Sequence, residues 1–419
     1  MADATDLPLS KTNIVDPALL ECPFGFERRL REEAPVLKDE ATGFYQVSTY
    51  ALACEVLRDH ETYSAKFRAL LQGKHRKAPA VEAIMAEGYP VVEILHTSDA
   101  PVHTRSRKLV NKAFTVQRVN EMEADIQKTV NELIDGFAAR GAVEFVREFS
   151  QLLPMLVVAK QLGVPAEDLP KFRRWSDAFS SQYSHVAGEE AEIAAARTVV
   201  EFQKYFGTKL AEKRATPGDD MITELANATL EEEGDPRRLE DAEAVWIIQQ
   251  ILVAGNETTA HSLSEGMKLL LENPDQHKRL VADPELIGNF IEETLRILSP
   301  VYTMWRVVTR DTVLGGVAIP KDALVMVRFG SANHDEAIFP NGDAFDIDRE
   351  NAKKHIAFGW GIHLCIGAQL ARKEMLVAYR TLFSRLTNWR FAPGKNDFTH
   401  HPSVLLRGLK KLELEFDPA

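Results

Sequence analysis

The chain has 419 residues, of which 45% are hydrophobic and 27% are charged, a composition typical of a globular protein. Its formal net charge of −12 argues against a general nucleic-acid-binding protein, because such a protein needs a cationic surface. The three cysteines, Cys22, Cys54 and Cys365, lie far apart in the sequence, which excludes a disulfide framework and a zinc site of the CxxC type.

The sequence gives no sign of a membrane-spanning or targeting segment. No stretch approaches the roughly 20 consecutive apolar residues that a membrane-spanning helix needs. The N-terminal sequence MADATDLPLSKTN has neither the basic nor the apolar segment of a signal peptide. We therefore expect a soluble, cytoplasmic protein with no membrane partner.

Long helices are predicted through the middle of the chain, because apolar residues recur there with i, i+3, i+4 spacing. The longest of them is followed directly by Asn273-Pro274, and proline ends a helix. The polar stretch 215–241 is expected to form two loops around a short helical segment. The predicted helices are Gln117–Arg140, Glu189–Arg214, Asp241–Glu272, Glu285–Leu298 and Ala368–Leu386.

The predicted strands are few and short, and turn residues bound them. Gly43–Val47 lies near the N-terminus and Lys411–Phe416 near the C-terminus, while Val307–Leu314 and Ala323–Val327 flank a turn-rich segment. The pattern predicts a mainly α protein with small antiparallel β-sheets (α+β). Because the sheet segments come from both ends of the chain, we expect a single domain over residues 1–419.

The most specific motif surrounds Cys365 and reads FGWGIHLCIG, a glycine-punctuated loop before the apolar helix 368–386. A thiolate at a helix N-terminus is stabilised by the unpaired backbone N–H groups and by the helix dipole. Gly359 permits an unusual backbone and the close approach of a flat ligand, and Phe358 is placed to shield the sulfur from water. The other two cysteines have no such setting, and we expect them to be inert.

This motif resembles the haem-binding loop of the cytochrome P450 family, F-G-x-G-x-H-x-C-x-G, at every fixed position. Three further motifs resemble that family in order and spacing, and together they cover roughly residues 95–410. The resemblance implies a cytochrome P450 fold with haem b (iron protoporphyrin IX) between the long central helix and the helix after the cysteine. It also implies that Cys365 is the axial ligand of the haem iron.

The second motif is Ala254-Gly-Asn-Glu-Thr-Thr259, midway along the long predicted helix. A threonine hydroxyl can bond back to the carbonyl one turn earlier, and Gly255 weakens the helix, so a simple kink is one interpretation. The resemblance instead implies an oxygen-binding groove, with Ala254 beside the haem. In that groove Thr258 takes part in oxygen activation and Glu257 supplies protons; Asp is also common in the family where this chain has Glu257.

The third motif is the pair Glu293 and Arg296, which share a helix face at i, i+3 spacing. Such pairs usually lie on solvated surface and contribute little. The resemblance implies a structural clamp on the haem-binding core, with Arg349 as its third member. We interpret these three residues as structural and not catalytic.

The fourth motif contains His103 and Arg107, which are one helical turn apart and can face the same anion. A basic helix face on the surface is the alternative. The resemblance assigns His103, Arg107, Arg306 and His363 to the two haem propionates, whose burial needs cationic partners.

The function that the resemblance implies is a haem-thiolate monooxygenase, which inserts one oxygen atom of O2 into a hydrophobic small molecule by hydroxylation or epoxidation. Electrons would come from NAD(P)H through a separate ferredoxin or flavodoxin-type carrier and its reductase, because the chain has no dinucleotide fingerprint. A peroxide-driven haem peroxygenase and a non-catalytic haem ligand-binding protein are the alternatives, and Glu257-Thr258 count against the first. We expect a monomer.

The resemblance also places a mainly apolar substrate pocket in the segments Phe67–Leu95 and Ala178–Val186. Gln250 shares the helix face of Thr258, and we expect its amide to bond a polar group of the substrate; a neighbouring backbone or a water is the alternative. The pocket residues expected outside those segments are Gln250, Val253, Val301, Tyr302, Leu405 and Leu406.

Basic residues flank the motifs that are expected on the cysteine side of the haem. On a chain of charge −12, such a patch suits an acidic ferredoxin that is steered electrostatically; scattered solvated cations are the alternative. The residues are Arg105, Lys108, Lys112, Lys353, Lys354, Arg372 and Lys373.

Overall fold

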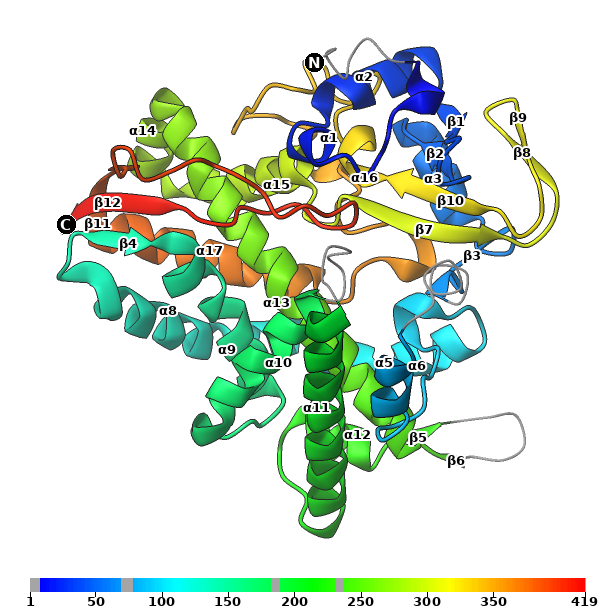
Figure 1. Ribbon diagram of the computed structural model, residues 1–419. Helices are drawn as coiled ribbons and strands as arrows, with labels where there is room; N and C mark the ends of the chain where they lie inside the picture. Colours follow the sequence, from blue (N-terminus) through cyan, green and yellow to red (C-terminus); the bar gives the residue numbers. More distant parts are fainter. Residues whose placement is uncertain (1–7, 69–77, 182–188, 231–236, 419) are drawn as a thin grey trace. The chain divides into compact units, whose positions relative to one another are not determined.

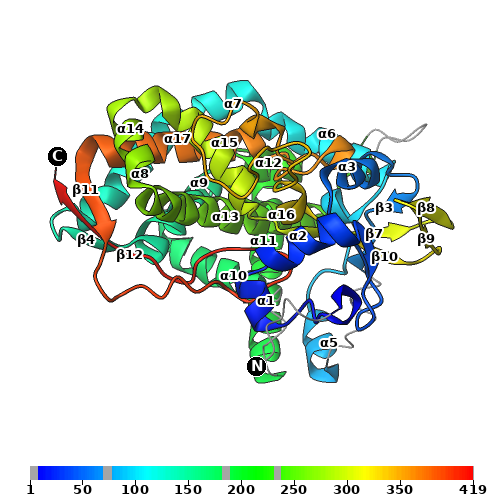
Figure 2. The same ribbon diagram turned by 90° about the horizontal axis from the view of Figure 1, so that it is seen from above.

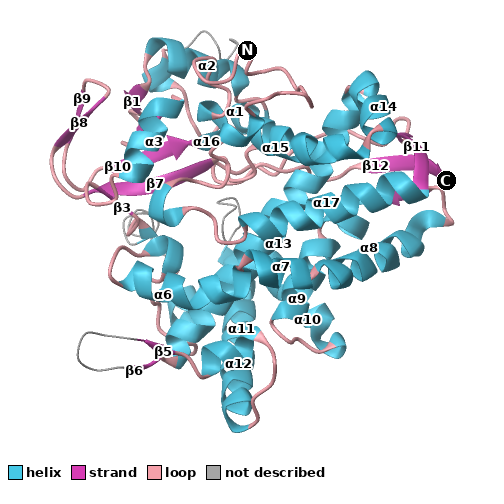
Figure 3. Cartoon of the chain, turned by 180° about the vertical axis from the view of Figure 1, so that it is seen from behind, coloured by secondary structure: helices cyan, strands magenta, loops and turns pink. Residues whose placement is uncertain are grey.

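Helices account for most of the secondary structure, and the strands are short (Figures 1 and 3). The structure is a computed structural model that describes residues 8–68, 78–181, 189–230 and 237–418. The chain divides into two units. Unit 1 comprises Met1–Phe67, Glu123–Leu153 and Thr258–Ala419, and unit 2 comprises Arg68–Met122 and Pro154–Glu257.

The long helix α13 has the predicted bounds, Asp241–Glu272, and passes from unit 2 into unit 1. The predicted helix Gln117–Arg140 is instead two helices, α7 (Val116–Glu121) and α8 (Glu123–Ala138), with Met122 between them. The other predicted helices are α11 (Glu189–Ala215), α15 (Ile287–Leu298) after the 3-10 turn Pro284–Leu286, and α17 (Ala368–Arg385).

Unit 1 contains a five-stranded sheet with the strand order β1-β2-β10-β7-β3. The strand pairs in the described residues are antiparallel, as predicted, except that β2 pairs with β10 in parallel. The parallel pair joins β2, near the N-terminus, to a strand about 280 residues later. The strands are β1 (Val36–Lys38), β2 (Tyr45–Val47), β3 (Tyr63–Ser64), β7 (Thr303–Val308) and β10 (Leu324–Arg328).

Helix α3 (Tyr50–Arg58) packs on this sheet through Ala53, Val56 and Leu57, which form one buried cluster with strand residues such as Val47 (Figures 1 and 2). A hairpin of β8 (Thr312–Leu314) and β9 (Val317–Ile319) turns at Gly315-Gly316. A second sheet has the order β11-β12-β4, with β11 (Leu386–Phe391), β12 (Glu413–Pro418) and β4 (Ala142–Glu144). Unit 1 also contains α1 (Pro17–Glu21), α2 (Phe24–Glu33), α14 (Pro274–Ala282) and α16 (Phe329–Ala332).

Unit 2 is built around an aromatic cluster between α10 (Leu169–Ser181) and α11. The ring centroids of Trp175 and Phe202 lie 5.6 Å apart, edge to face, which is a favoured aromatic arrangement. The polar stretch forms α12 (Met221–Ala226) and the paired strands β5 (Thr229–Leu230) and β6 (Arg237–Arg238). The remaining helices are α5 (Pro79–Met85), α6 (Val102–Asn111) and α9 (Leu152–Gln161).

Among the described residues, we find no helix that combines the length and the apolar character needed to cross a membrane.

Candidate functional site

The loop that carries Cys365 has a backbone that needs glycine at two positions. Gly359 (φ +73°) and Gly361 (φ +69°) are left-handed, and a Cβ on Gly361 would lie 2.7 Å from a backbone oxygen of α3. The N–H of Cys365 donates to the carbonyl of Phe358 across 2.8 Å, which closes the loop. A Cβ on Gly367, the N-cap of α17, would lie 4.0 Å from the cysteine Sγ. The sulfur is therefore beside the start of a helix, where the free N–H groups favour a thiolate.

The surroundings of this thiol fit the haem that the sequence predicts. Cys365 is exposed, and Trp360, Ile362 and Leu364 around it are 40%, 38% and 47% exposed. Within the described part of the chain, no three His, Cys, Asp or Glu side chains are placed to hold a metal ion together. A lone exposed cysteine suits a metal that brings its other ligands with it, as haem iron does. Cys54, in contrast, is buried in α3, and burial raises the pKa of its thiol.

The four predicted propionate ligands are distributed over both units. In unit 1, Arg306 is buried on β7, where its guanidinium donates to the preceding carbonyl at 2.7 Å, and His363 ends the 3-10 turn before the cysteine. In unit 2, His103 is buried on α6, and Arg107 lies one turn later and donates from Nε to an asparagine across 3.0 Å. Each is a cation or hydrogen-bond donor, as a carboxylate requires, and the propionate role stays a prediction.

The oxygen-groove motif lies within α13. Ala254 is exposed although it is in the middle of a 32-residue helix, and Glu257 and Thr258 are half-buried. The carbonyl of Thr258 accepts from the hydroxyl of Ser262 at 2.8 Å. A Cβ on Gly255 would come within 3.0 Å of a side-chain carbon of α9. Close packing of the two helices therefore favours glycine at this position, in addition to its effect on helix flexibility.

The contacts of Gln250 favour a structural role for its amide over the predicted contact with the substrate. The side chain is buried, its Nε2 donates to the carbonyl of Ile94 across 3.0 Å, and its Oε1 lies 2.8 Å from Nδ1 of His96. Because a backbone carbonyl only accepts, the amide orientation is fixed, and the imidazole N–H must be the donor to Oε1. The prediction rested on the apolar neighbours of Gln250 within α13, which offer no side-chain partner, and it left a neighbouring backbone open as the alternative. The partners come from the 3-10 segment around Leu95–Thr97, so the alternative of a backbone partner is favoured.

We expect Gln250→Leu to lower the free energy of unfolding by about 1–3 kcal/mol, because it removes two hydrogen bonds of the buried amide, one to the Ile94 carbonyl, which keeps only Thr97 as a donor, and one with His96. Urea denaturation measures the change. Gln249→Leu is the matched control, since Gln249 is equally buried and its Oε1 has no hydrogen-bond partner among the described residues. Unchanged stability in Gln250→Leu, together with altered positions of substrate oxidation, would restore the substrate contact.

The other predicted pocket residues lie in both units. In unit 1, Val301 and Leu406 form a β-bridge, and the N–H of Tyr302 donates to the carbonyl of Leu405 across 2.7 Å. In unit 2, Val253 is half-buried on α13. Residues 69–77 and 182–186, which belong to the two predicted pocket segments, lie outside the described residues.

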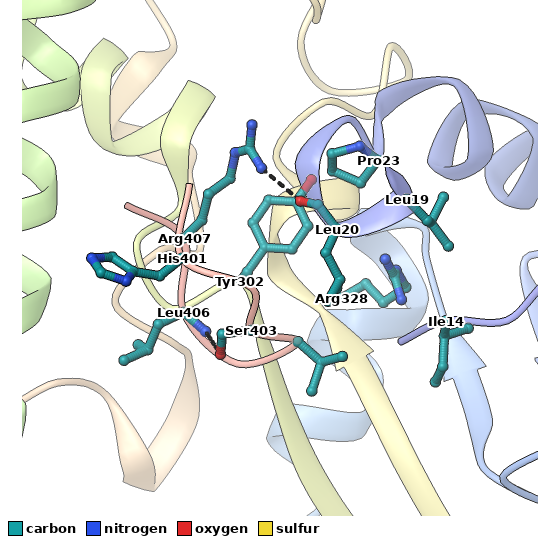
Figure 4. Close-up of a pocket in the computed structure, with 11 residues that line it drawn as sticks. Ile14, Leu19, Leu20, Pro23, Tyr302, Arg328, His401, Ser403, Leu406 and Arg407 are labelled. Carbon is teal, nitrogen blue, oxygen red and sulfur yellow. Dashed lines mark hydrogen bonds between the residues drawn. The ribbon is translucent and has the colours of Figure 1, made fainter. Parts of the chain in front are cut away.

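Tyr302 has contacts that favour a structural role for its side chain. Its hydroxyl donates to Glu27 at 2.7 Å, and its ring lies against Gly330 of α16. Burial and the nearby carboxylate raise the pKa of Tyr302 well above its usual value, so the hydroxyl keeps its proton. It lines a cavity of about 20 Å³ together with Leu406 and with Leu20 of α1 (Figure 4), and this space has room for a single water molecule.

The clamp residues are in direct contact and buried, Glu293 and Arg296 completely so. Arg296 donates to both oxygens of Glu293 at 2.7 and 2.8 Å, and Arg349 donates from Nε to the same carboxylate at 3.1 Å. Arg296 also donates to the carbonyls of Asn333 and Gly342 at 2.8 and 2.7 Å. The three side chains thus connect α15 to the chain that approaches the cysteine loop.

A polar network that the sequence did not predict lies beside Phe358. Arg372 donates to both oxygens of Glu292 at 2.6 and 2.9 Å, and His355 lies 3.2 Å from the same carboxylate. Burial of Glu292 opposes its charge, but these two partners outweigh the burial and lower its pKa to about 2. The only signal in the sequence was the proximity of Arg372 and His355 to the cysteine motif.

The same contacts correct the predicted docking patch. Arg372 is committed to Glu292, and Lys373 pairs with Glu123 of α8 at 2.5 Å, so neither is a freely solvated cation. Lys353 and Lys354 are exposed in unit 1.

Comparisons with known proteins agree on one family. A family model described as Cytochrome P450 matches residues 189–416, more than half of the chain. A steroid C26-monooxygenase of Mycobacterium tuberculosis is 34% identical over 100% of this chain and 99% of its own length. A vitamin D(3) 25-hydroxylase of Pseudonocardia autotrophica is 37% identical over 76% of this chain and 77% of its own length.

The solved structure of cytochrome P450 CYP109Q5 from Chondromyces apiculatus is 31% identical, with a TM-score of 0.86. The alignment covers 98% of this chain and all of that one. The mainly helical architecture with small sheets is therefore the P450 fold. The chain belongs to the cytochrome P450 family of monooxygenases.

Proposed function

We propose that this enzyme inserts one oxygen atom of O2 into a hydrophobic small molecule, and that Cys365 would bind the iron of a haem b group. The observation that carries the proposal is the exposed thiol at the N-terminus of α17, in a loop whose shape depends on Gly359 and Gly361. The haem supplies the oxygen chemistry when bound, and an electron-rich thiolate ligand favours cleavage of the O–O bond.

The residues of α13 would handle protons in this reaction. Thr258 offers a hydroxyl that can both donate and accept, and Glu257 at the preceding position offers a carboxyl group that can exchange protons with water. Both are half-buried, so water can reach them while the neighbouring helix turns stay packed. His103, Arg107, Arg306 and His363 would neutralise the haem propionates.

A steroid or a related polycyclic compound is the first substrate class to test, because two of the similar proteins are named for steroid and vitamin D oxidation. The half-buried apolar side chains of Val301, Leu405 and Leu406 fit such a molecule, since ligand pockets are mostly apolar. Hydroxylation is the simplest outcome, and epoxidation applies if the substrate carries an alkene.

The electrons would come from NAD(P)H through a separate ferredoxin or flavodoxin and its reductase. In unit 1, an acidic carrier would be attracted by the exposed cations Lys353 and Lys354. In unit 2, the corresponding cations are Arg105 and Lys108 of α6 and Lys112 of the turn that follows it.

The direct test is product formation from a steroid panel in the presence of O2, NADH and a ferredoxin system, compared with hydrogen peroxide alone. Product that forms only with the electron-transfer system supports the monooxygenase, whereas product formed equally well with peroxide alone would indicate a peroxygenase.

Thr258→Ala is expected to bind substrate and consume NADH as before but to release hydrogen peroxide in place of most of the oxidised product. The reason is that the variant lacks the hydroxyl that positions a proton donor. Peroxide and product are both quantified per NADH. Thr258→Ser keeps the hydroxyl and should stay coupled; full coupling in the alanine variant would remove Thr258 from proton delivery.

A further inference from the structure

The ring of Phe358 is held by two side chains from different segments of unit 1. The guanidinium of Arg372 lies 4.5 Å from the ring centroid, within the range of a cation–π contact. The imidazole of His355 lies 5.7 Å from the same ring, with the two planes tilted by 46°. Phe358 is half-buried, so these contacts limit how its ring can rotate.

Arg372 is itself fixed by a buried carboxylate. Glu292 of α15 is nearly inaccessible, with 5% of its side chain exposed, and accepts two hydrogen bonds from the guanidinium. Such a bidentate pair fixes the plane of the guanidinium as well as its distance.

The orientation of His355 is also determined. The backbone N–H of Ala357 donates to its Nδ1 at 3.2 Å, so this nitrogen accepts, and Nε2–H is left to donate to Glu292. One carboxylate of α15 therefore orients both groups that contact the Phe358 ring.

Phe358 is tied in turn to the sulfur-bearing residue. Its carbonyl accepts the N–H of Cys365 at 2.8 Å, and Arg372 lies on α17, the helix that begins just after the cysteine. Ring, cation and sulfur thus belong to one short stretch of chain. A cation on one face of an aromatic ring draws the π electrons of the ring toward itself. The rest of the ring is then less negative and repels a negative sulfur less.

We propose that Arg372, anchored by Glu292 and His355, is a positioning residue that acts through the Phe358 ring to set how strongly the Cys365 sulfur donates electrons. This inference rests on the proposed haem ligation by Cys365. It assigns to Arg372 a role in the haem reduction potential in place of the electron-carrier contact that its charge first suggested.

The test is the reduction potential of the haem-loaded enzyme, measured by spectroelectrochemistry in Arg372→Gln. Loss of the cation should make the sulfur a stronger donor and shift the ferric-to-ferrous equilibrium about tenfold toward ferric, which is 59 mV for a one-electron couple. Arg380→Gln is the control. Arg380 lies on the same helix and pairs with the exposed Glu285 at 3.7 Å, so the same loss of charge there should leave the potential unchanged.

Two further variants separate the possible causes. Arg372→Gln combined with Glu292→Gln leaves no buried charge unpaired, so it keeps the test usable if the single variant folds poorly, and it should show the same shift. In a Phe358→Leu background, Arg372→Gln should no longer change the potential. A full shift in that background means that the charge acts directly through space and overturns the role of the ring.

An unshifted potential in Arg372→Gln, matching Arg380→Gln, overturns the proposal as a whole. The wild-type carbon-monoxide spectrum tests the underlying ligation separately. If the wild-type protein lacks the red-shifted band of a thiolate-bound haem, the proposed function fails, whatever the variants show.

Discussion

Cys365→His is expected to abolish the red-shifted Soret band of the reduced, carbon-monoxide-bound protein and, with it, all monooxygenase activity. Imidazole is a neutral ligand and lacks the electron donation of a thiolate, so a protein that still binds haem should give a spectrum of the histidine-ligated type. The measurement is a difference spectrum of the dithionite-reduced protein, with haem content determined in parallel.

Cys22→Ala and Cys54→Ala are the matched controls, since one removes an exposed thiol and the other a buried thiol. Both should keep the band of the wild-type protein. The assignment of Cys365 as the ligand is wrong if the Cys365→His protein keeps the same band at full haem loading.

Arg296→Ala is expected to destabilise the protein by about 3–5 kcal/mol, because it leaves the buried carboxylate of Glu293 with an incomplete set of partners. The carbonyls of Asn333 and Gly342 lose their donor as well. Since a natural domain is stable by only about 5–15 kcal/mol, much of the protein should fail to fold or to retain haem. Urea unfolding monitored by circular dichroism gives the free energy.

Arg279→Ala is the control with the same chemistry on the surface. Arg279 donates to both oxygens of Asp348 at 2.7 and 2.9 Å, but the two side chains are 55% and 46% exposed. Exposed pairs contribute little to stability because solvent screens them, so this variant should be nearly as stable as the wild type. Equal losses of unfolding free energy in the two variants would show that burial is not the reason why the clamp stabilises the protein.

Local sequence patterns predicted the features that depend on neighbouring residues. The bounds of α13 could be read from its apolar periodicity and from Asn273-Pro274, and they agree with the structure. The glycine pattern around Cys365 predicted a sharp loop before a helix, and Gly361 has the left-handed backbone that such a loop needs. The break between α7 and α8 at Met122 was missed, because no proline or glycine marks it.

Contacts between distant residues could not be predicted in this way. Gln250 and Ile94 are separated by 156 positions, and Arg372 and Glu292 by 80. Nothing in either local sequence indicates which surface will pack against it, so the partner of Arg372 was missed and a backbone partner of Gln250 was only one of two alternatives. A periodic pattern says which face of a helix is covered, and the covering residue follows only from the tertiary structure.

Within the cysteine loop, a position that accepts only glycine lies between positions whose side chains are exposed. At Gly361 even alanine would press its methyl group on the backbone of α3, so any side chain there forces the loop and the helix apart. Trp360, Ile362 and Leu364 expose their side chains between these fixed points. A mutant library confined to these three positions would therefore vary the side chains beside the cysteine while the glycine-defined backbone stays in place. The backbone of the loop thus leaves room for other side chains at Trp360, Ile362 and Leu364 but not at Gly361.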